Sequence, residues 1–143
     1  MEKKIFFGIS MFSGGGIADL GFKINEVKFI AHNELIKERA ELVKINNSHS
    51  KVFAEDAWKC YSEIIKYAKS KLSNEKLFLL FSTPPCQGMS QNGVGTILNN
   101  IRKGKRPKLD PRNRLVIPSL YIAMELKPEW VVFENVIAMK NTI

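Results

Sequence analysis

The chain has 143 residues, of which 45% are hydrophobic and 25% are charged, a composition typical of one ordinary folded domain. Its apolar stretches are too short to cross a membrane, and its basic N-terminus runs into glycines rather than a cleavage site, so we expect neither a membrane anchor nor a secretory signal. The net charge of +8 favours a polyanionic partner, and the two cysteines suggest a reducing cytoplasm rather than a disulfide framework.

Strand-like and helical patterns alternate along the chain. Apolar runs typical of strands cover residues 5–12, 27–32, 52–54, 77–81 and 130–133, and helical patterns cover residues 17–22, 36–45, 61–72 and 121–126. Strands separated by helices predict an α/β fold with a parallel sheet covered on both faces. No regular element is predicted between Ser82 and about Asn113, and we expect residues 87–109 to be mobile without a bound partner.

Glycines or acids follow each of the first three predicted strands. Gly14 and Gly16 allow a tight turn and a close approach to a ligand. Glu34 lies 18 residues beyond Gly16, where an acid commonly holds the ribose hydroxyls of a nucleotide, and Asp56 is placed to accept a hydrogen bond from an adenine amino group. Taken singly, these residues also suit a structural turn, surface acids or helix caps. The third glycine of a nicotinamide-binding motif would fall on Asp19, which argues against an oxidoreductase.

Two polar groups follow the last two predicted strands. Cys86 comes directly after two prolines that restrict the backbone, which makes it a candidate nucleophile. Glu134 ends the fifth strand, and a carboxyl at this depth, beside the cysteine of the neighbouring strand, is a candidate acid. The alternatives are an inert thiol and an ordinary polar strand end. Cys60, which precedes a helical pattern, is interpreted as structural.

Taken in order, these segments resemble the motifs of the DNA cytosine-5 methyltransferase family. The resemblance covers nearly the whole chain, and its most specific part is the proline–cysteine–glutamine motif followed by glutamate–asparagine–valine. The six motifs correspond to residues 12–16, 33–34, 56, 84–90, 110–115 and 134–136. The resemblance implies a Rossmann-like S-adenosylmethionine-dependent methyltransferase fold with an incomplete parallel sheet, in which residues 1–143 form the cofactor-binding and catalytic subdomain.

The resemblance also implies a reaction and a set of residues. A methyl group would pass from S-adenosylmethionine to ring carbon 5 of a flipped cytosine in double-stranded DNA, leaving S-adenosylhomocysteine. Cys86 would attack ring carbon 6, Glu134 would protonate or hydrogen-bond ring nitrogen 3, and Asn135 would help to position Glu134 and the loop. The residues implied in cofactor binding are Phe12, Ser13, Gly14, Gly16, Glu34, Asp56, Pro84 and Leu115.

A basic stretch supplies most of the residues that would contact DNA. Residues 102–114 hold seven Lys or Arg against one acid, a stretch that composition alone would explain as a solvated loop. The resemblance implies that this stretch is a phosphate-contacting part of a mobile catalytic loop. The residues expected at DNA are Gln87, Ser90, Arg102, Lys103, Lys105, Arg106 and Arg112. We expect no metal site.

Family members continue beyond the sixth motif with a glutamine–arginine–arginine motif, a target-recognition domain and a final segment that returns to the cofactor pocket. These are absent from the chain, so we expect a fragment, or one subunit of a split enzyme whose partner polypeptide or missing C-terminal region supplies target recognition. The isolated chain should then be inactive. The expected setting is a restriction–modification system in a bacterial cytoplasm. Two alternatives stay open: the tRNA-methylating branch of the same family, and a non-catalytic cofactor- or nucleic-acid-binding module.

Overall fold

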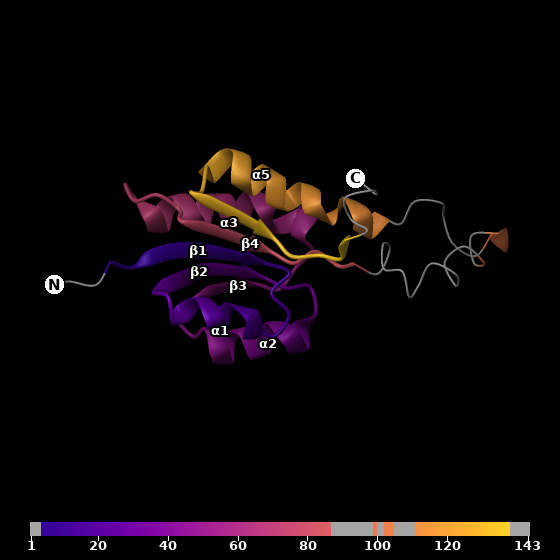
Figure 1. Cartoon of the computed structure of the whole chain (residues 1–143), viewed down its shortest axis with the longest axis horizontal. Helices are drawn as coiled ribbons and strands as arrows, with labels where there is room; N and C mark the ends of the chain where they lie inside the picture. The colour runs from indigo at the N-terminus through magenta and orange to yellow at the C-terminus, as the bar shows by residue number, and fades with distance from the viewer. Residues whose placement is uncertain (1–3, 87–98, 100–101, 105–110, 138–143) are drawn as a thin grey trace.

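Five parallel strands form a single sheet in the computed structural model, which describes residues 4–86, 99, 102–104 and 111–137. The strands are β1 (Phe6–Met11), β2 (Val27–Asn33), β3 (Lys51–Phe53), β4 (Leu79–Ser82) and β5 (Trp130–Phe133). Their order across the sheet is β3-β2-β1-β4-β5, and every neighbouring pair is parallel. All carboxyl ends therefore lie at one end of the sheet, on the right in Figure 1.

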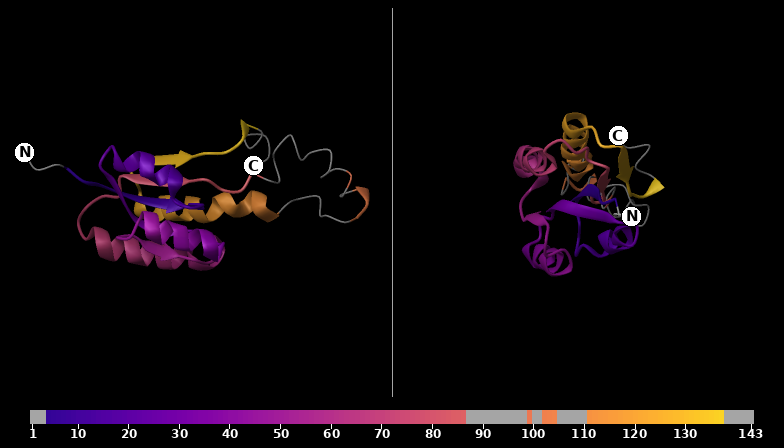
Figure 2. Two further views of the ribbon diagram at one scale, coloured as in Figure 1. Left: turned by 90° about the horizontal axis from the view of Figure 1, so that it is seen from below. Right: turned by 90° about the vertical axis from the view of Figure 1, so that its left-hand side faces the viewer.

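Helices cover both faces of this sheet, as the sequence predicts. One face carries α1 (Ile17–Lys23) and α2 (Lys37–Asn46), and the other carries α3 (Ala57–Leu72) and α5 (Val116–Leu126). The end-on view in Figure 2 separates these two layers. A 3₁₀ helix, η1 (Pro111–Leu115), runs directly into α5. None of the helices in the described part of the chain is long and apolar enough to cross a membrane.

The central strands are apolar because both of their faces are buried. The larger hydrophobic cluster joins the sheet to α3 and α5 through residues such as Ile9, Leu80, Ile64 and Ile122. A smaller cluster lies under α1 and contains Phe29, Leu79 and Phe81, with Phe22 of α1 packed against it. The core therefore spans the middle of the sheet and leaves the carboxyl ends of the strands available for a site.

Two helices begin earlier than the sequence pattern predicts. Helix α3 begins at Ala57 rather than at residue 61, because the Asp56 side chain caps it by accepting a hydrogen bond from the Trp58 backbone N–H at 2.9 Å. Cys60 consequently lies inside the helix instead of before it. Helix α5 extends from the predicted residues 121–126 back to Val116, and Pro118 falls in its first turn, where the missing N–H has no cost.

The stretch after Ser82 contains regular structure that the sequence reading missed. The 3₁₀ helix begins at Pro111, and Asn99 and Arg102 are helical, with the Lys103 N–H donating to the Asn99 carbonyl at 3.0 Å. The expectation that no regular element occurs before about Asn113 is therefore wrong at these positions. The expected mobility of residues 87–109 concerns a segment that lies, apart from residues 99 and 102–104, outside the described residues.

Candidate functional site

A cavity of about 620 Å³ opens at the carboxyl ends of the strands. This volume falls in the range of sites that hold a small-molecule ligand or cofactor. Its walls come from the ends of β1, β2 and β4, the first residues of α2 and α3, and η1. The lining residues are Phe12, Asn33, Glu34, Leu35, Ile36, Arg39, Asp56, Ala57, Trp58, Thr83, Pro85, Cys86, Arg112 and Leu115.

The turn after β1 forms one wall and depends on glycine. The Ser13 N–H donates to the Asn33 carbonyl at 2.9 Å, and the Gly16 N–H donates back to the Ser13 carbonyl at 2.8 Å. Gly14 and Gly16 have φ values of 58° and 71°, and a Cβ at Gly16 would lie 2.8 Å from Asn47 Nδ2. Phe12, which lines the cavity, also has a positive φ of 59°, an unusual conformation for a bulky residue that points to a functional constraint.

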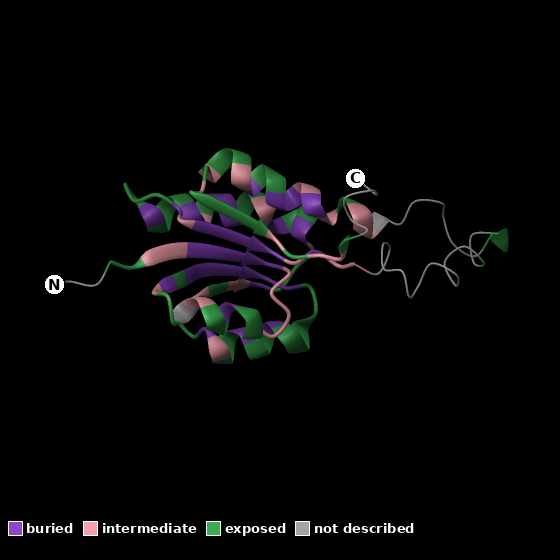
Figure 3. Ribbon diagram, viewed as in Figure 1, coloured by how far each residue is buried: buried purple, intermediate pink, exposed green. Residues whose placement is uncertain are grey.

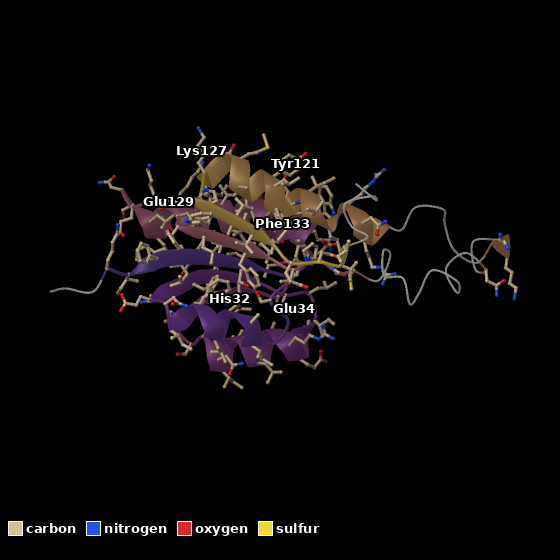
Figure 4. All side chains as sticks on the ribbon, in the orientation of Figure 1. His32, Glu34, Tyr121, Lys127, Glu129 and Phe133 are labelled. Atoms are coloured by element: carbon tan, nitrogen blue, oxygen red, sulfur yellow. The ribbon has the colours of Figure 1, made fainter. Side chains whose placement is uncertain are left out.

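Glu34 ties this turn to the next helix. One carboxylate oxygen accepts the Gly14 N–H at 2.8 Å, and the other accepts the Ile36 N–H at 2.9 Å. The residue is only 6% exposed, so these two backbone donors compensate a buried carboxylate. Figure 4 shows Glu34 at the end of β2. The carboxylate therefore shapes the cavity wall while its own orientation is held from two sides.

Asp56 and Trp58 form the wall contributed by α3. Asp56 caps the helix through one carboxylate oxygen, which fixes the orientation of the whole carboxylate at the cavity. Trp58, Leu35 and Ile36 are large apolar residues that line the cavity while 39%, 62% and 42% exposed. The site therefore combines two acids with an apolar surface, which suits a ligand that has both polar and apolar parts.

The sequence reading did not assign eight of the lining residues: Asn33, Leu35, Ile36, Arg39, Ala57, Trp58, Thr83 and Pro85. A usable signal existed for two of them, because Leu35 and Ile36 directly follow the strand-end acid Glu34 and are apolar at the start of an exposed helix. The sequence did not indicate Trp58 as a lining residue, because the predicted helix began at residue 61 whereas α3 begins at Ala57. Arg39 stands in an ordinary amphipathic pattern that gives no hint of the cavity.

The segment that carries Cys86 is anchored to β1 and to α5. The Thr83 N–H donates to the Met11 carbonyl at 3.2 Å, and its hydroxyl donates to the Phe12 carbonyl at 2.9 Å. The buried hydroxyls of Ser82 and Ser119 are 2.9 Å apart and share a hydrogen bond. These contacts hold the end of β4 in place, and Cys86 lies half-buried at the cavity four residues after Ser82.

The segment after β5 lies beside the cysteine-bearing segment. The Glu134 N–H donates to the Ser82 carbonyl at 3.0 Å, and the Asn135 side-chain amide donates to the Pro84 carbonyl at 2.8 Å. Asn135 also accepts the Val136 N–H at 2.8 Å, which fixes its amide group. Residues 134–136 are thus locked against residues 82–84, although about fifty residues separate them in the sequence.

Not every predicted residue lines the cavity. Ser13, Gly14, Gly16 and Pro84 shape the segments behind its walls, and Glu134 and Asn135 are absent from its lining. Glu134 is exposed and lies just past the end of β5, the edge strand of the described sheet.

The predicted DNA-contacting residues divide into three groups. Arg102 and Lys103 are exposed, whereas Arg112 is half-buried and lines the cavity. The remaining four, Gln87, Ser90, Lys105 and Arg106, lie outside the described residues. Among the residues with described positions, no group of three or more His, Cys, Asp or Glu could hold a metal ion.

The second cysteine has surroundings unlike those of Cys86. Cys60 is only 3% exposed, and its sulfur accepts a hydrogen bond from the Asn33 side-chain amide at 3.3 Å. Burial, together with the negative charges of Glu55 and Asp56, raises the pKa of the Cys60 thiol to about 11. The thiol is therefore protonated at neutral pH, when a nucleophile would need to be a thiolate.

A family model described as C-5 cytosine-specific DNA methylase matches residues 6–142. The chain belongs to this family. One relative in the family is the type II methyltransferase M1.HgaI of Avibacterium volantium, which is 34% identical over 94% of this chain and 35% of its own length. Another is the type II methyltransferase M.AquIA of a Picosynechococcus strain, at 30% identity over 99% of this chain and 51% of its own length. The chain thus spans between a third and a half of these relatives.

Solved structures of methyltransferases share the fold. A DNA modification methyltransferase encoded within an E. coli prophage aligns with a TM-score of 0.68 at 25% identity, over 94% of this chain and 33% of that one. Dnmt2 methyltransferase of S. pombe aligns with a TM-score of 0.64 over 97% of this chain and 37% of its own, and its 13% identity makes it a likeness of fold alone. These likenesses confirm the Rossmann-like fold of S-adenosylmethionine-dependent methyltransferases.

Proposed function

We propose that this chain is the cofactor-binding, nucleophile-bearing part of a DNA cytosine-5 methyltransferase of a bacterial restriction–modification system. The observation that carries the proposal is that Cys86, Glu34 and Asp56 line one cavity in a chain that belongs to the C-5 cytosine-specific DNA methylase family. Activity requires the rest of the protein, in the form of a second polypeptide or a C-terminal region that recognises the target. The isolated chain is therefore expected to be inactive.

The cavity suits S-adenosylmethionine, which would supply the methyl group. The Glu34 carboxylate, held by two backbone N–H groups, is placed to accept hydrogen bonds from ribose hydroxyls. Asp56 would accept the adenine amino group, and Phe12 would pack against the adenine ring. Leu115 and Pro84 would complete the pocket, and the turn formed by Ser13, Gly14 and Gly16 would bring the backbone close to the ligand.

The chemistry proposed for the protein residues is nucleophilic activation of a poor carbon nucleophile. The Cys86 thiolate forms a bond to ring carbon 6 of cytosine, while Glu134 donates a proton or hydrogen bond to ring nitrogen 3. Ring carbon 5 would then take the methyl group that S-adenosylmethionine supplies, leaving S-adenosylhomocysteine. Water would remove the proton of ring carbon 5, and ring nitrogen 3 would return any proton to Glu134, as the ring double bond forms again and the Cys86 thiolate departs. Asn135, through its bond to the Pro84 carbonyl, acts as a positioning residue for the segment that carries Cys86.

Double-stranded DNA is the proposed substrate. The net charge of +8 favours a phosphate backbone through counterion release. Arg102 and Lys103 are exposed and available for such contacts. Arg112, which lines the same cavity as Cys86, would orient the flipped nucleotide. The other residues proposed for DNA contact are Gln87, Ser90, Lys105 and Arg106.

A mechanism-based trap tests this function in the complete assembly, meaning this chain together with the polypeptide that supplies the remaining length of its relatives. In the presence of S-adenosylmethionine, a duplex carrying 5-fluorocytosine at the target should form a covalent adduct, because fluorine stands in place of the proton that must leave ring carbon 5 before Cys86 is released. Peptide mapping should place the adduct on Cys86. The Cys60→Ser variant should still form it, whereas Cys86→Ser should not. An adduct on Cys60, or none with any duplex, would refute the proposal, and an adduct only with fluorocytosine-containing tRNA would favour the tRNA-methylating branch.

A further inference from the structure

Asn33 is the last residue of β2 and lines the cavity, yet its side chain takes no part in the proposed chemistry. The residue is only 1% exposed, in a strand that Figure 3 shows as largely buried. Burying a side-chain amide is unfavourable unless protein hydrogen bonds replace those it made with water. The partners of this amide therefore indicate what the residue does.

The side-chain amide of Asn33 binds the turn between β3 and α3. Its Nδ2 donates to the Glu55 carbonyl at 2.8 Å and to the Phe53 carbonyl at 3.2 Å. A longer contact of 3.3 Å joins the same nitrogen to the Cys60 sulfur. The shortest of these three contacts, to Glu55, therefore ties the residue directly before Asp56 to the end of β2.

The carboxylate of Asp56, which is proposed to accept the adenine amino group, takes its orientation from α3. One carboxylate oxygen accepts the Trp58 N–H at 2.9 Å, and the Asp56 carbonyl accepts the Lys59 N–H at 2.9 Å. These bonds fix the carboxylate relative to α3, but they do not fix the start of α3 relative to the sheet. The hydrogen bond from Asn33 to the Glu55 carbonyl supplies that second constraint.

The backbone of Asn33 holds the glycine turn after β1. Its carbonyl accepts the Ser13 N–H at 2.9 Å and the Ser13 hydroxyl at 3.3 Å. Glu34, the next residue in the chain, accepts the Gly14 N–H at 2.8 Å through its carboxylate. The glycine turn, the Glu34 carboxylate and the turn before Asp56 are thus joined at one residue.

We propose that Asn33 is a positioning residue for the adenine end of the cofactor site, acting through the Glu55 carbonyl on the carboxylate of Asp56. An amide suits this role because its nitrogen has two N–H groups, which can serve two carbonyl oxygens at once. The proposal rests on the proposed function, because it takes S-adenosylmethionine as the ligand of the cavity. A side-chain substitution leaves the backbone carbonyl of Asn33 in place, so it should impair recognition of the adenine amino group and spare the contacts of the glycine turn and Glu34.

Two ligands separate the positioning of Asp56 from a general stabilisation of the cavity. S-adenosylhomocysteine carries the adenine amino group, whereas its inosine analogue carries a carbonyl oxygen in that place, which a carboxylate repels. In a calorimeter, the wild-type chain should bind the adenine ligand at least about tenfold more tightly than the inosine ligand. Asn33→Leu, which removes both donors at nearly constant volume, should reduce this preference to less than about threefold, while the affinity for the inosine ligand changes by less than about threefold.

Further variants keep the test decisive. Cys60→Ser is the matched control, because it alters the third neighbour of the Asn33 amide and leaves both carbonyl acceptors in place; it should keep the wild-type preference. Asn33→Ser, whose hydroxyl is one bond shorter than the amide, should lose the preference as well and serves if Asn33→Leu does not fold. In an Asp56→Ser background, which keeps a capping oxygen but removes the carboxylate, Asn33→Leu should change the preference no further.

The outcomes separate this proposal from the proposed function. Absence of binding to wild type would overturn the assignment of the cofactor together with the role of Asn33. Binding by wild type, with an unchanged preference in the Asn33 variants, would overturn the role of Asn33 alone. Equal weakening of both ligands by Asn33→Leu, or a further loss of preference in the Asp56→Ser background, would also overturn it, because Asn33 would then act on the cavity as a whole.

Discussion

The cavity and the interior of the sheet both contain polar groups, but they use them in different ways. In the cavity, Cys86 and Asp56 are half-buried and face a volume that a ligand can enter. In the interior, Asp19 and His32 are both fully buried, with their side chains 3.1 Å apart between Asp19 Oδ2 and His32 Nε2. The contrast predicts that changes in the cavity alter binding or chemistry, whereas changes in the interior alter stability.

The interior group joins three elements. Asp19 in α1 accepts a hydrogen bond from the Ser10 hydroxyl of β1 at 2.9 Å. His32 in β2 shares a hydrogen bond with the Ser50 hydroxyl, at 2.6 Å from its Nδ1. Figure 4 labels His32 on β2, one residue before the strand ends at Asn33. The Ser13 hydroxyl donates to the Ser10 carbonyl at 3.1 Å, so the network also supports the glycine turn that forms the cavity wall.

The largest effect is expected from the cavity nucleophile. In the complete assembly, Cys86→Ser should lower the rate of methyl transfer by at least about 1,000-fold, because a hydroxyl is a far weaker nucleophile than a thiolate at neutral pH. The thermal midpoint of unfolding should stay within the error of the measurement. Incorporation of labelled methyl groups into duplex DNA gives the rate, with Cys60→Ser as the matched control. A wild-type rate for Cys86→Ser would remove this cysteine from the mechanism.

A substitution in the interior of the sheet should instead lower the stability of the protein. Asp19→Ala should lower the free energy of unfolding by about 3 kcal/mol, because it leaves His32 and Ser10 buried without their partner. Urea denaturation of the isolated chain measures this change. Glu41→Ala is the control, since it removes an exposed ion pair with Lys44 and should change stability by less than about 0.5 kcal/mol. Equal, small changes in the two variants would show that the interior pair contributes little.

A substitution of Glu34 should alter both ligand binding and stability, because this residue lines the cavity and is also buried. We expect the isolated chain to bind S-adenosylmethionine weakly, and Glu34→Ala to weaken that binding by at least about tenfold through the loss of hydrogen bonds to a charged group. The same change should reduce stability, since it leaves the N–H groups of Gly14 and Ile36 without their acceptor. Calorimetry and urea denaturation test the two effects, with exposed Glu38→Ala as control. Equal affinity of wild type and Glu34→Ala would place Glu34 outside the cofactor site.

The smallest effect concerns the reactivity of Cys60 in the Cys86→Ser background, where it is the one remaining cysteine. Its raised pKa of about 11 means that the thiolate fraction should grow about tenfold per pH unit from pH 8 to pH 10. Alkylation by iodoacetamide, followed by mass spectrometry of the folded protein, should rise in the same proportion. A rate that levels off near pH 9, the ordinary thiol value, would show that burial does not suppress ionisation of Cys60.

Much of the site could be predicted because the topology of a parallel sheet is simple. Residues that follow successive parallel strands meet at one end of the sheet, so the positions of Phe12, Glu34, Asp56 and Cys86 after their strands were enough to bring them together. The helix starts were less predictable. The Asp56 side chain caps α3 four residues before the apolar pattern becomes clear, and a side-chain hydrogen bond of this kind leaves little trace in hydrophobic periodicity.

The amino-acid sequence by itself determined the α/β class, the order of the elements and the family, because the periodicity and the spacing of motifs are local properties of the chain. Only the tertiary structure decided which side chains share a wall or a hydrogen bond. The contact of Asn135 with Pro84 and the burial of Asp19 against His32 both join segments distant in sequence. Such relations depend on how the layers pack in space, and the local pattern of residues does not encode them separately.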